Sequence, residues 1–570
     1  MSLPILGQDS APVSRRPGRL RAAVLLAVHA LIALHIAIWW HTGRALAPLE
    51  PSEAMELSKH GIVNAGAIFF LVAALGTAIF GRFFCGWGCH ILALQDLCGW
   101  MMRRVGLRPR PLRSRALLWV PTLAFAYMFL WPLVYRGWIA DPILEVRGVQ
   151  LYTSDFWATF PPLGIALTTF LVCGFAAVYF LGNKGFCAYA CPYGALFGAA
   201  DRLAPLRIRV DTSCTGCARC TAVCTSDVLV HREVAEHGAV VSSACMKCLD
   251  CVAACPEGAL RLGWGRPALF LGRDVEPGSR PRLLAVREEW ILVVAFVATF
   301  LTSRGLYGRV PFLLALGLSA VVASSALVAV RLVRGREARL PGLSLQRAGR
   351  LRPAGRVFLV ISALGAVLLA HSAFIRSHEW RAERAWARGE TEVFARHAGV
   401  AAEHGLLRRP DLYLAMAAAS LERGDVAGWE ARLDGAEAAG ASPPALLTAR
   451  AEGLRRQGHG RQAIGVYERL IDAAPDLEGT YSASASVWLE LGDPEAASRV
   501  VERGLRNRGR RASAALLHLA GRLALQCGDS IAAEARFRRA LQREPGYVPA
   551  QKDLTALLAT APRPRGDTEP

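Results

Sequence analysis

Eight cysteines near the middle of the chain fall into two runs that share one spacing. The first run reads CTGCARCTAVC and the second CMKCLDCVAACP, and both follow C-x2-C-x2-C-x3-C. In this pattern three thiolates curl around one iron–sulfur cube, and the longer step sends the fourth thiolate to a second cube. The spacing predicts two [4Fe–4S] clusters, one held by Cys214, Cys217, Cys220 and Cys255 and the other by Cys245, Cys248, Cys251 and Cys224.

Zinc is the alternative ion for such cysteines, because C-x2-C pairs also bind zinc tetrahedrally. The duplicated spacing favours iron–sulfur cubes. One irregularity stands out: Thr225 follows the first run, at a position where Pro256 follows the second. Residues 207–265 suffice for a small ferredoxin-like module, in which Val228–Val230 and Val240–Val241 are expected to form strands.

Four further cysteines stand in pairs directly after apolar runs, in GRFFCGWGCH and GFCAYACPYG. Cysteines four residues apart share a face if the segment is helical, so the two pairs could converge on one site. Soft thiolates at that density suit Cu(I), zinc or an iron–sulfur centre. Redox-active disulfides and unligated thiols are the alternatives, and His90 is either a nitrogen ligand or a headgroup residue. This candidate third metal site consists of Cys85, Cys89, Cys187 and Cys191.

Apolar runs close to the roughly 20 residues that span a bilayer recur along the chain. The first run could be a secretory signal, but its apolar core exceeds the roughly 7–15 residues of a signal, so an uncleaved anchor is favoured. The fifth run is the shortest. The predicted spans are 22–40, 62–80, 116–135, 163–181, 290–302, 310–330 and 357–375.

The net charge of +20 is concentrated in alternate connecting segments. Arginines crowd 81–115 and 331–356, whereas 136–161 and 303–310 hold only two Lys or Arg each. This alternation is the positive-inside pattern of a membrane protein, and it argues against a nucleic-acid surface. It places the cysteine-bearing segments, 182–287 included, in the cytoplasm, where thiols stay reduced, and the C-terminal part on the opposite side.

Two groups of polar residues are further candidates for contact with the membrane or a cofactor. The arginine-rich segment 91–115 is expected to bind membrane lipid, with an acidic redox partner as the alternative. The histidines His29, His35 and His371 lie within predicted spans. Quinol proton transfer or haem ligation would use such residues, but neutral packing is the favoured interpretation.

Beyond residue 375 the chain becomes rich in Ala, Arg, Glu and Leu, and a repeat of 34–36 residues emerges. That period is typical of tetratricopeptide repeats (TPR), each of which is an antiparallel helix pair. Such arrays present a concave surface that binds proteins, although a spacer is the alternative. Cys527 is expected in the core. The turns of the repeat are predicted at Gly389, Gly424, Gly458, Gly492 and Gly528.

Residues 60–265 resemble the membrane polyferredoxins of the NapH, NosR and CcoG type. The most specific pieces are CAYACP at 187–192 and CMKCLDCVAACP at 245–256, and His90 stands where that family has proline. The resemblance implies electron transfer at the bacterial inner membrane, in quinol oxidation or in metalloenzyme maturation.

Together these patterns predict a multi-pass α-helical membrane protein with a cytoplasmic two-cluster ferredoxin-like (α+β) module and a C-terminal all-α TPR solenoid. Its expected function is electron transfer between a quinol or cytoplasmic donor and a redox partner, with a periplasmic protein bound by the repeats. Copper reduction or metalloenzyme maturation and redox sensing are the alternatives, and no motif for independent bond cleavage is found. The predicted segments are 1–21 cytoplasmic, 22–206 four-span, 207–265 ferredoxin-like, 288–375 three-span, 376–560 repeat and 561–570 disordered.

Overall fold

The computed structural model describes residues 16–109, 112, 114–138, 146, 148–153, 162–271, 284–336, 338–347, 349–544 and 546–560. Residues 1–15 of the predicted cytoplasmic segment 1–21, and the disordered tail predicted at 561–570, lie outside these ranges. The chain divides into two compact units, one of residues 1–39 and 45–372 and the other of residues 40–44 and 373–570.

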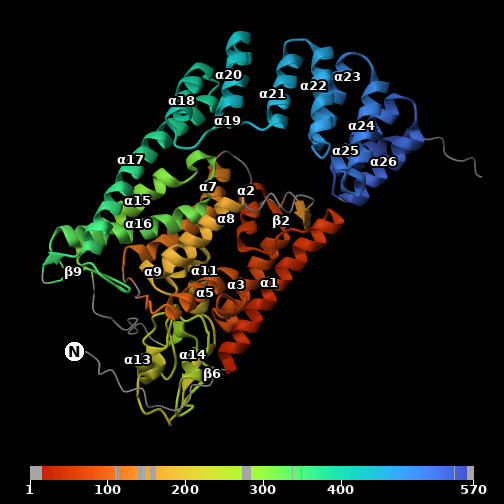
Figure 1. The fold of residues 1–570 in the computed structure, drawn as a ribbon. Coiled ribbons are helices and arrows are strands. Elements are labelled where there is room, and N and C mark those ends of the chain that lie inside the picture. The colour runs from red at the N-terminus through yellow and green to blue at the C-terminus, as the bar shows by residue number, and fades with distance from the viewer. Residues whose placement is uncertain are drawn as a thin grey trace, which may run out of the picture. The chain divides into compact units, whose positions relative to one another are not determined.

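Long apolar helices form the first unit (Figure 1). Among the described residues, five helices are long and apolar enough to cross a membrane: 17–42, 117–138, 163–181, 312–333 and 353–387. All five coincide with predicted spans. They include α1 (Arg16–Thr42), α6 (Val120–Phe125), α7 (Trp131–Trp138), α8 (Leu163–Thr169), α9 (Ala177–Leu181), α16 (Phe312–Val333) and α17 (Pro353–Ala387).

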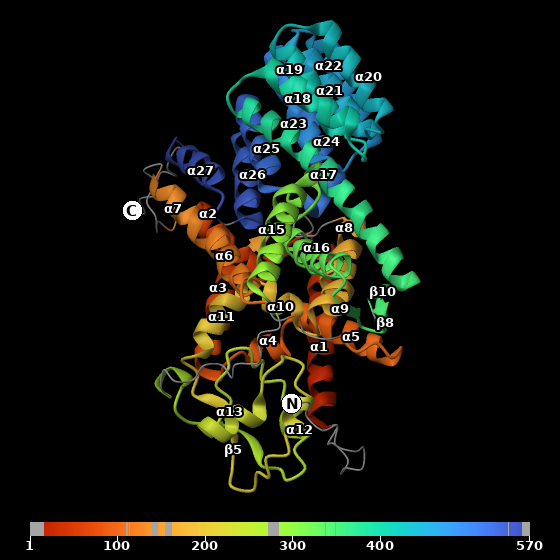
Figure 2. The ribbon, with the colours of Figure 1, turned by 90° about the vertical axis from the view of Figure 1, so that its left-hand side faces the viewer.

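The other two predicted spans form shorter or more polar helices. Helix α3 (Ala65–Phe80) has 16 residues and is apolar throughout. Helix α15 (Val286–Ser303) carries Glu288 and Glu289 in its first turn. Glu288 pairs with Arg331 of α16 at 2.9 Å, and α15 and α16 pack together as a hairpin (Figure 2).

Two of the spans contain a π-helical turn, at Ala126–Leu130 and Phe170–Ala176. The core of this unit forms where α9, α15 and α16 meet, around Ala177, Leu292 and Ala320, which have no exposed surface. Small side chains at such crossings let helix backbones approach closely.

Short elements connect these helices. Helix α2 spans Met55–His60 and α5 spans His90–Arg104. Four two-stranded pairs lie in the connections: β1 (Ala45–Leu46) with β4 (Tyr152–Thr153), β2 (Ile62–Asn64) parallel to β3 (Gly148–Gln150), β7 (Arg339–Leu340) with β8 (Leu343–Ser344), and β9 (Gln346–Arg347) with β10 (Arg350–Leu351).

The cysteine-rich module lies at one end of the first unit (Figure 2). Strand β5 (Leu206–Val210) pairs antiparallel with β6 (Leu260–Trp264), so the two strands bracket both cysteine runs. A short helix lies within each run, α12 (Arg219–Ala222) in the first and α14 (Asp250–Ala253) in the second, and α13 (Val230–His237) lies between the runs.

The strand prediction at Val228–Val230 is wrong, because α13 begins at Val230. Val230 and Val234, one helical turn apart, are both buried against the cysteine loops, and Gly238 ends the helix at a φ of 66°. At the second predicted strand the backbone makes a single bridge, from Ala239 to Arg209.

The second unit is a row of antiparallel helix pairs (Figure 1). The predicted turn glycines are confirmed: each of the five has a positive φ of 71–82°, which glycine adopts without strain. The helices are α18 (Thr391–His404), α19 (Pro410–Glu422), α20 (Val426–Ala438), α21 (Pro443–Arg456), α22 (Gly460–Ala473), α23 (Glu478–Glu490), α24 (Pro494–Arg508), α25 (Ala514–Gln526), α26 (Ser530–Arg543) and α27 (Val548–Thr560).

Large side chains of this unit sit against small residues of the partner helix. The ring of Phe537 fills the space where a Cβ on Gly521 would lie, and Tyr481 does the same at Gly504. The expectation that Cys527 is a core residue is wrong, since its side chain is exposed. Cys527 follows the last residue of α25 and therefore belongs to the turn.

Candidate iron–sulfur centres and the junction between them

The first predicted set of ligands lines a single cavity. Cys214, Cys217, Cys220 and Cys255 face it together with His231 and Pro256. Cys220 is buried, whereas Cys214 and Cys217 are exposed. A centre held here would lie at the surface of the module.

The second predicted set is gathered more deeply. Burial raises the pKa of the Cys251 thiol, and the neighbouring thiolates of Cys245, Cys248 and Cys224 raise it further. Burial also raises the pKa of Cys248, with Asp250 adding to the effect. Thiolates that destabilise one another in this way are favoured by a bound metal cation.

The backbone around the two sets is duplicated. In each run the residue before the second cysteine and the residue after it have positive φ, and so does the third residue after the fourth cysteine. These positions are Gly216, Ala218 and Asp227 in the first run and Lys247, Leu249 and Gly258 in the second. Positive φ is costly for residues other than glycine and persists only where the surroundings impose it.

The donor set, the shared cavity and the duplicated loops fit a [4Fe–4S] cluster at each run. Within the described ranges no three potential ligands are arranged as a ready-made metal site. The fit therefore stands on the chemistry of the thiolates and on the loop geometry. When bound, each cluster would carry one electron at a time.

The two cysteine pairs also converge. Cys85 lies on helix α4 (Phe83–Trp87) and Cys187 lies on helix α10 (Gly185–Tyr189). Cys89 and Cys191 come after the ends of these helices, in non-helical backbone. The pairs thus do not share one continuous helical face. All four thiols nevertheless line one cavity of about 370 Å³.

Burial governs the chemistry of these four thiols. It raises the pKa of Cys89 to about 12, with further increases from Cys187 and Cys85. The pKa of Cys191 is also raised well above the usual value, by burial and then by the other three thiols. Gln95 donates an Nε2–H bond to Cys187 Sγ at 3.0 Å. Four neighbouring thiolates in such a pocket would be stabilised by a bound cation.

The loop that carries Cys85 and Cys89 packs directly on the loop that carries Cys245 and Cys248. Trp87 Nε1 donates a hydrogen bond to the Lys247 carbonyl at 2.9 Å. A Cβ on Gly86 would lie 2.0 Å from the Met246 carbonyl oxygen, so only glycine fits there. The candidate third site and the second cluster site are therefore neighbours across a close backbone contact.

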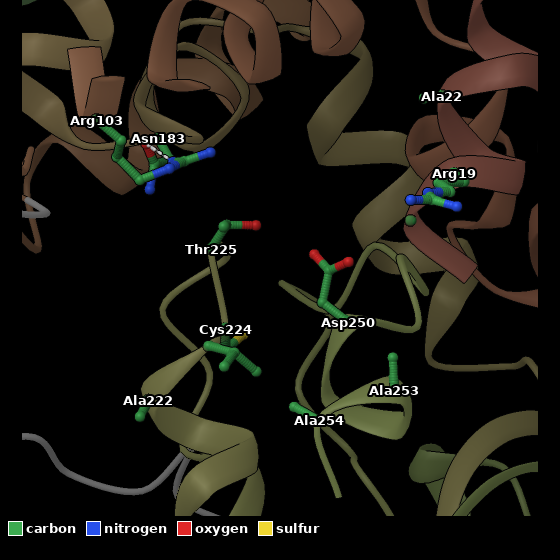
Figure 3. Close-up of a pocket in the computed structure, with 12 residues that line it drawn as sticks. Arg19, Ala22, Arg103, Asn183, Ala222, Cys224, Thr225, Asp250, Ala253 and Ala254 are labelled. Carbon is green, nitrogen blue, oxygen red and sulfur yellow. Dashed lines mark hydrogen bonds between the residues drawn. The ribbon is translucent and has the colours of Figure 1, made fainter. Parts of the chain in front are cut away.

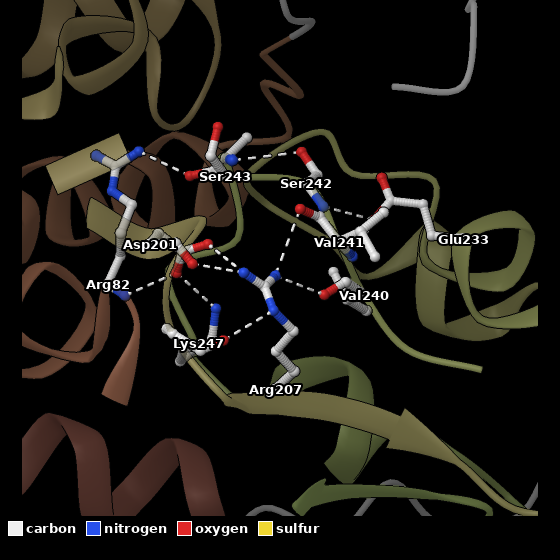
Figure 4. A network of polar contacts seen from close by, with 11 residues as sticks. Arg82, Asp201, Arg207, Glu233, Val240, Val241, Ser242, Ser243 and Lys247 are labelled. Atoms are coloured by element: carbon white, nitrogen blue, oxygen red, sulfur yellow. Dashed lines mark hydrogen bonds and ion pairs between the residues drawn. The ribbon is translucent and has the colours of Figure 1, made fainter. Parts of the chain in front are cut away.

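A buried ionic network fixes this junction (Figure 4). Asp201, at the end of α11 (Tyr193–Asp201), accepts a bond from Lys247 Nζ at 2.8 Å and lies 3.4 Å from Arg207 Nη2. All three side chains are at most 1% exposed. Arg82 completes the network, because its N–H donates to Asp201 at 3.0 Å and its Nη1 to the Ser243 carbonyl at 3.1 Å.

A second set of charges holds the other side of the junction. Asp96 of α5 pairs with Arg21 of α1 and with Lys184. These cations lower the pKa of the Asp96 carboxyl, although burial opposes them. Arg21 also donates through Nε to the Gly86 carbonyl at 2.7 Å.

A surface groove passes beside the second cluster site (Figure 3). Cys224 and Thr225 lie on one wall, one above the other, and Asp250 lies on the opposite side. Arg19 and Arg103 line the groove as well, and Arg103 Nη1 is 3.5 Å from Asn183 Oδ1.

Sequence reasoning missed the ionic network. Its members carry no motif of their own, although Arg82 lies inside the stretch GRFFCGWGCH.

The histidines of the predicted spans have separate surroundings in the structure. His29 Nδ1 lies 2.7 Å from the Leu25 carbonyl oxygen, and His35 Nε2 lies 3.0 Å from the Leu46 carbonyl oxygen. His371 lies on α17, with a buried Nε2 that has no hydrogen-bond partner among the described residues.

Two family models match the chain. A 4Fe-4S dicluster domain matches residues 206–256, and a 4Fe-4S binding domain matches 65–108 and 164–210, which contain the two cysteine pairs.

Curated relatives match about a third of the chain. Over 187 residues the chain is 27% identical to the methylamine utilization ferredoxin-type protein MauN of Methylorubrum extorquens, covering 31% of this chain and 60% of MauN. It is 28% identical to the ferredoxin-type protein NapH of Haemophilus influenzae, covering 34% and 66% of the two chains, and 28% identical to the putative electron transport protein YccM of Escherichia coli, covering 34% and 54%. The match thus spans about half to two thirds of these relatives.

Among solved structures, a thermophilic TPR protein of Thermus thermophilus is 15% identical, with a TM-score of 0.25, and the alignment covers 32% of this chain and 99% of that one.

Proposed function

We propose that this chain, which carries 4Fe-4S ferredoxin domains and is homologous to NapH, MauN and YccM, is a membrane-bound electron-transfer protein. Two [4Fe–4S] clusters would carry the electrons between a quinol or cytoplasmic donor and a partner redox enzyme. The observation that carries this proposal is the close packing of the Cys85–Cys89 loop on the Cys245–Cys248 loop.

The paired cysteines are proposed as a third redox centre at the inner face of the membrane. The 4Fe-4S binding domain model matches both pairs, and the four thiols line one cavity. The order of centres would then be the paired-cysteine site, the buried second cluster and the exposed first cluster. Exposure of Cys214 and Cys217 suits exchange of electrons with a soluble partner.

The cavity that the paired cysteines line is also the proposed quinol site, with the quinol in the part away from the thiols. The whole cavity has a volume of about 370 Å³, in the range of small-molecule sites, and apolar residues such as Leu31 and Phe69 line most of it. Glu50 and His90 add polar groups next to the thiols. Oxidation of a quinol to a quinone releases two electrons and two protons, and Glu50 is the proposed first proton acceptor.

The sidedness follows the charge pattern. Arginine-rich connections indicate that the ferredoxin-like module is cytoplasmic and that the helix pairs after residue 387 lie on the periplasmic side of the inner membrane. The helical repeats would bind a protein partner there, while the lipid bilayer surrounds the apolar helices.

Copper reduction or maturation of a metalloenzyme is the second candidate function. The observation in its favour is the same set of four thiols around one cavity, because soft thiolates prefer Cu(I). Redox sensing, with the clusters controlling the repeats, is a third candidate.

The proposal is tested on the full chain purified without oxygen. Stoichiometric iron and acid-labile sulfide, together with bleaching of the visible cluster band by a short-chain quinol, are the expected results. The variant C85S/C89S should lose quinol-driven bleaching but keep bleaching by dithionite. The matched control C98S changes a buried cysteine outside the sites and should behave like the parent chain.

Two outcomes contradict the proposal. A chain without iron and labile sulfide removes the electron-carrier function. Copper that is bound in the parent chain and lost in C85S/C89S, without any quinol-driven bleaching, favours the maturation function instead.

A further inference from the structure

The residues that follow the two cysteine runs differ in hydrogen-bonding capacity. Cys224 is followed by Thr225 and Ser226, whereas Cys255 is followed by Pro256 and Glu257. The loops themselves are equivalent, as the matching positive φ of Asp227 and Gly258 shows. The chain thus places hydroxyl groups at one cluster site and none at the equivalent positions of the other.

Both hydroxyls are buried without a partner. Thr225 Oγ1 and Ser226 Oγ have essentially no exposed surface and no hydrogen-bond partner among the described residues. A buried hydroxyl that lacks an acceptor is destabilising, so its presence here points to an acceptor that completes the site. Sulfur atoms of a cluster bound by Cys224 would be such acceptors. Thr225 also has a backbone N–H, which Pro256 lacks.

Donors aimed at a cluster have a predictable effect on its reduction potential. Reduction takes a [4Fe–4S]²⁺ core to [4Fe–4S]⁺ by adding one electron, and with four thiolates the whole centre becomes more negative. Hydrogen bonds to the sulfurs stabilise the more negative state. They therefore raise the potential of the cluster that receives them.

We propose that Thr225 and Ser226 are positioning residues that donate hydrogen bonds to the cluster bound by Cys224, Cys245, Cys248 and Cys251 and raise its reduction potential. This inference rests on the proposed cluster assignment. With these two hydroxyl groups, the cluster next to the paired-cysteine site is a better electron acceptor than the same cluster would be without them. Pro256 and Glu257 give the other cluster no such contribution.

The test is a redox titration of the full chain, with dithionite and mediators as the electron source and EPR as the readout. T225V/S226A removes both hydroxyls, and valine keeps the shape of threonine and the backbone N–H. One of the two midpoint potentials should fall while the other stays unchanged. T225S keeps a hydroxyl and should retain the higher midpoint. P256T, the reciprocal control, should raise only the midpoint that T225V/S226A leaves unchanged.

The outcomes separate this inference from the cluster assignment. A parent chain without two cluster signals refutes the assignment itself. Two intact clusters whose midpoints are the same in T225V/S226A and in the parent, or higher in the variant, refute the role of the hydroxyls. If the double variant binds less iron than the parent, T225V alone must still lower one midpoint, and an unchanged value refutes the inference.

Discussion

Replacing Asp201 by asparagine removes the carboxylate that Lys247 and Arg207 share in the buried network (Figure 4). Lys247 and Arg207, at 1% and 0% exposure, would then lose the carboxylate that pairs with both of them. Removal of one partner from a buried ion pair costs about 3–5 kcal/mol. Arg207 keeps carbonyl acceptors at Ala204 and Val240, so we expect a value near the lower end, about 3 kcal/mol.

Hydrogen exchange of the intact protein measures this cost locally. A loss of about 3 kcal/mol corresponds to exchange roughly 100-fold faster, since each 1.4 kcal/mol is about a factor of ten. The change should appear in peptides that contain β5 and the strand-like segment at Val240, whose N–H donates to the Ile208 carbonyl at 2.8 Å.

Two comparisons make the Asp201 prediction specific. D211N changes a carboxylate that is exposed and should alter exchange by less than about threefold. D201N/K247M removes both members of the closest pair and should restore part of the protection, because no lysine charge remains buried. An exchange rate in D201N within about fivefold of the parent would show that the network does not hold the junction.

Two further perturbations test the junction and the repeats. G86A should open the contact with the Met246 carbonyl and slow quinol-driven reduction of the clusters, leaving dithionite reduction intact, whereas G76A has no atom within 4 Å of the new methyl and should match the parent in both assays. F537A empties a fully buried position and should cost about 3–5 kcal/mol in thermal unfolding of the repeats, whereas I531A, at an 85% exposed position, should be nearly neutral. Equal effects within either pair would contradict the packing described.

The sequence predicted the local features that short spacing controls. The intervals between cysteines predict which thiols share a cluster, and this assignment stays a prediction; the structure places Cys214, Cys217, Cys220 and Cys255 around one cavity. The turns of the repeat were equally readable, because only glycine adopts the left-handed backbone there without strain. Long apolar runs predicted the membrane-length helices, because the length and composition of a run are also local features of the sequence.

Some local predictions failed where neighbouring elements decide. Val228–Val230 reads as a strand by composition, yet a helix that buries Val230 and Val234 together forms from residue 230. Cys527 has apolar neighbours, but its place in a turn exposes it.

Only the tertiary structure decided how the redox sites are joined. Asp201, Arg207 and Lys247 are separated by up to 46 positions, and nothing in their spacing marks them as partners. Their charges become mutually dependent only after burial removes water from around them, because unpaired charges are tolerable in water and costly in a protein interior. The cysteines thus identify the metal chemistry by short-range spacing, whereas long-range packing sets the contact through which the sites can communicate.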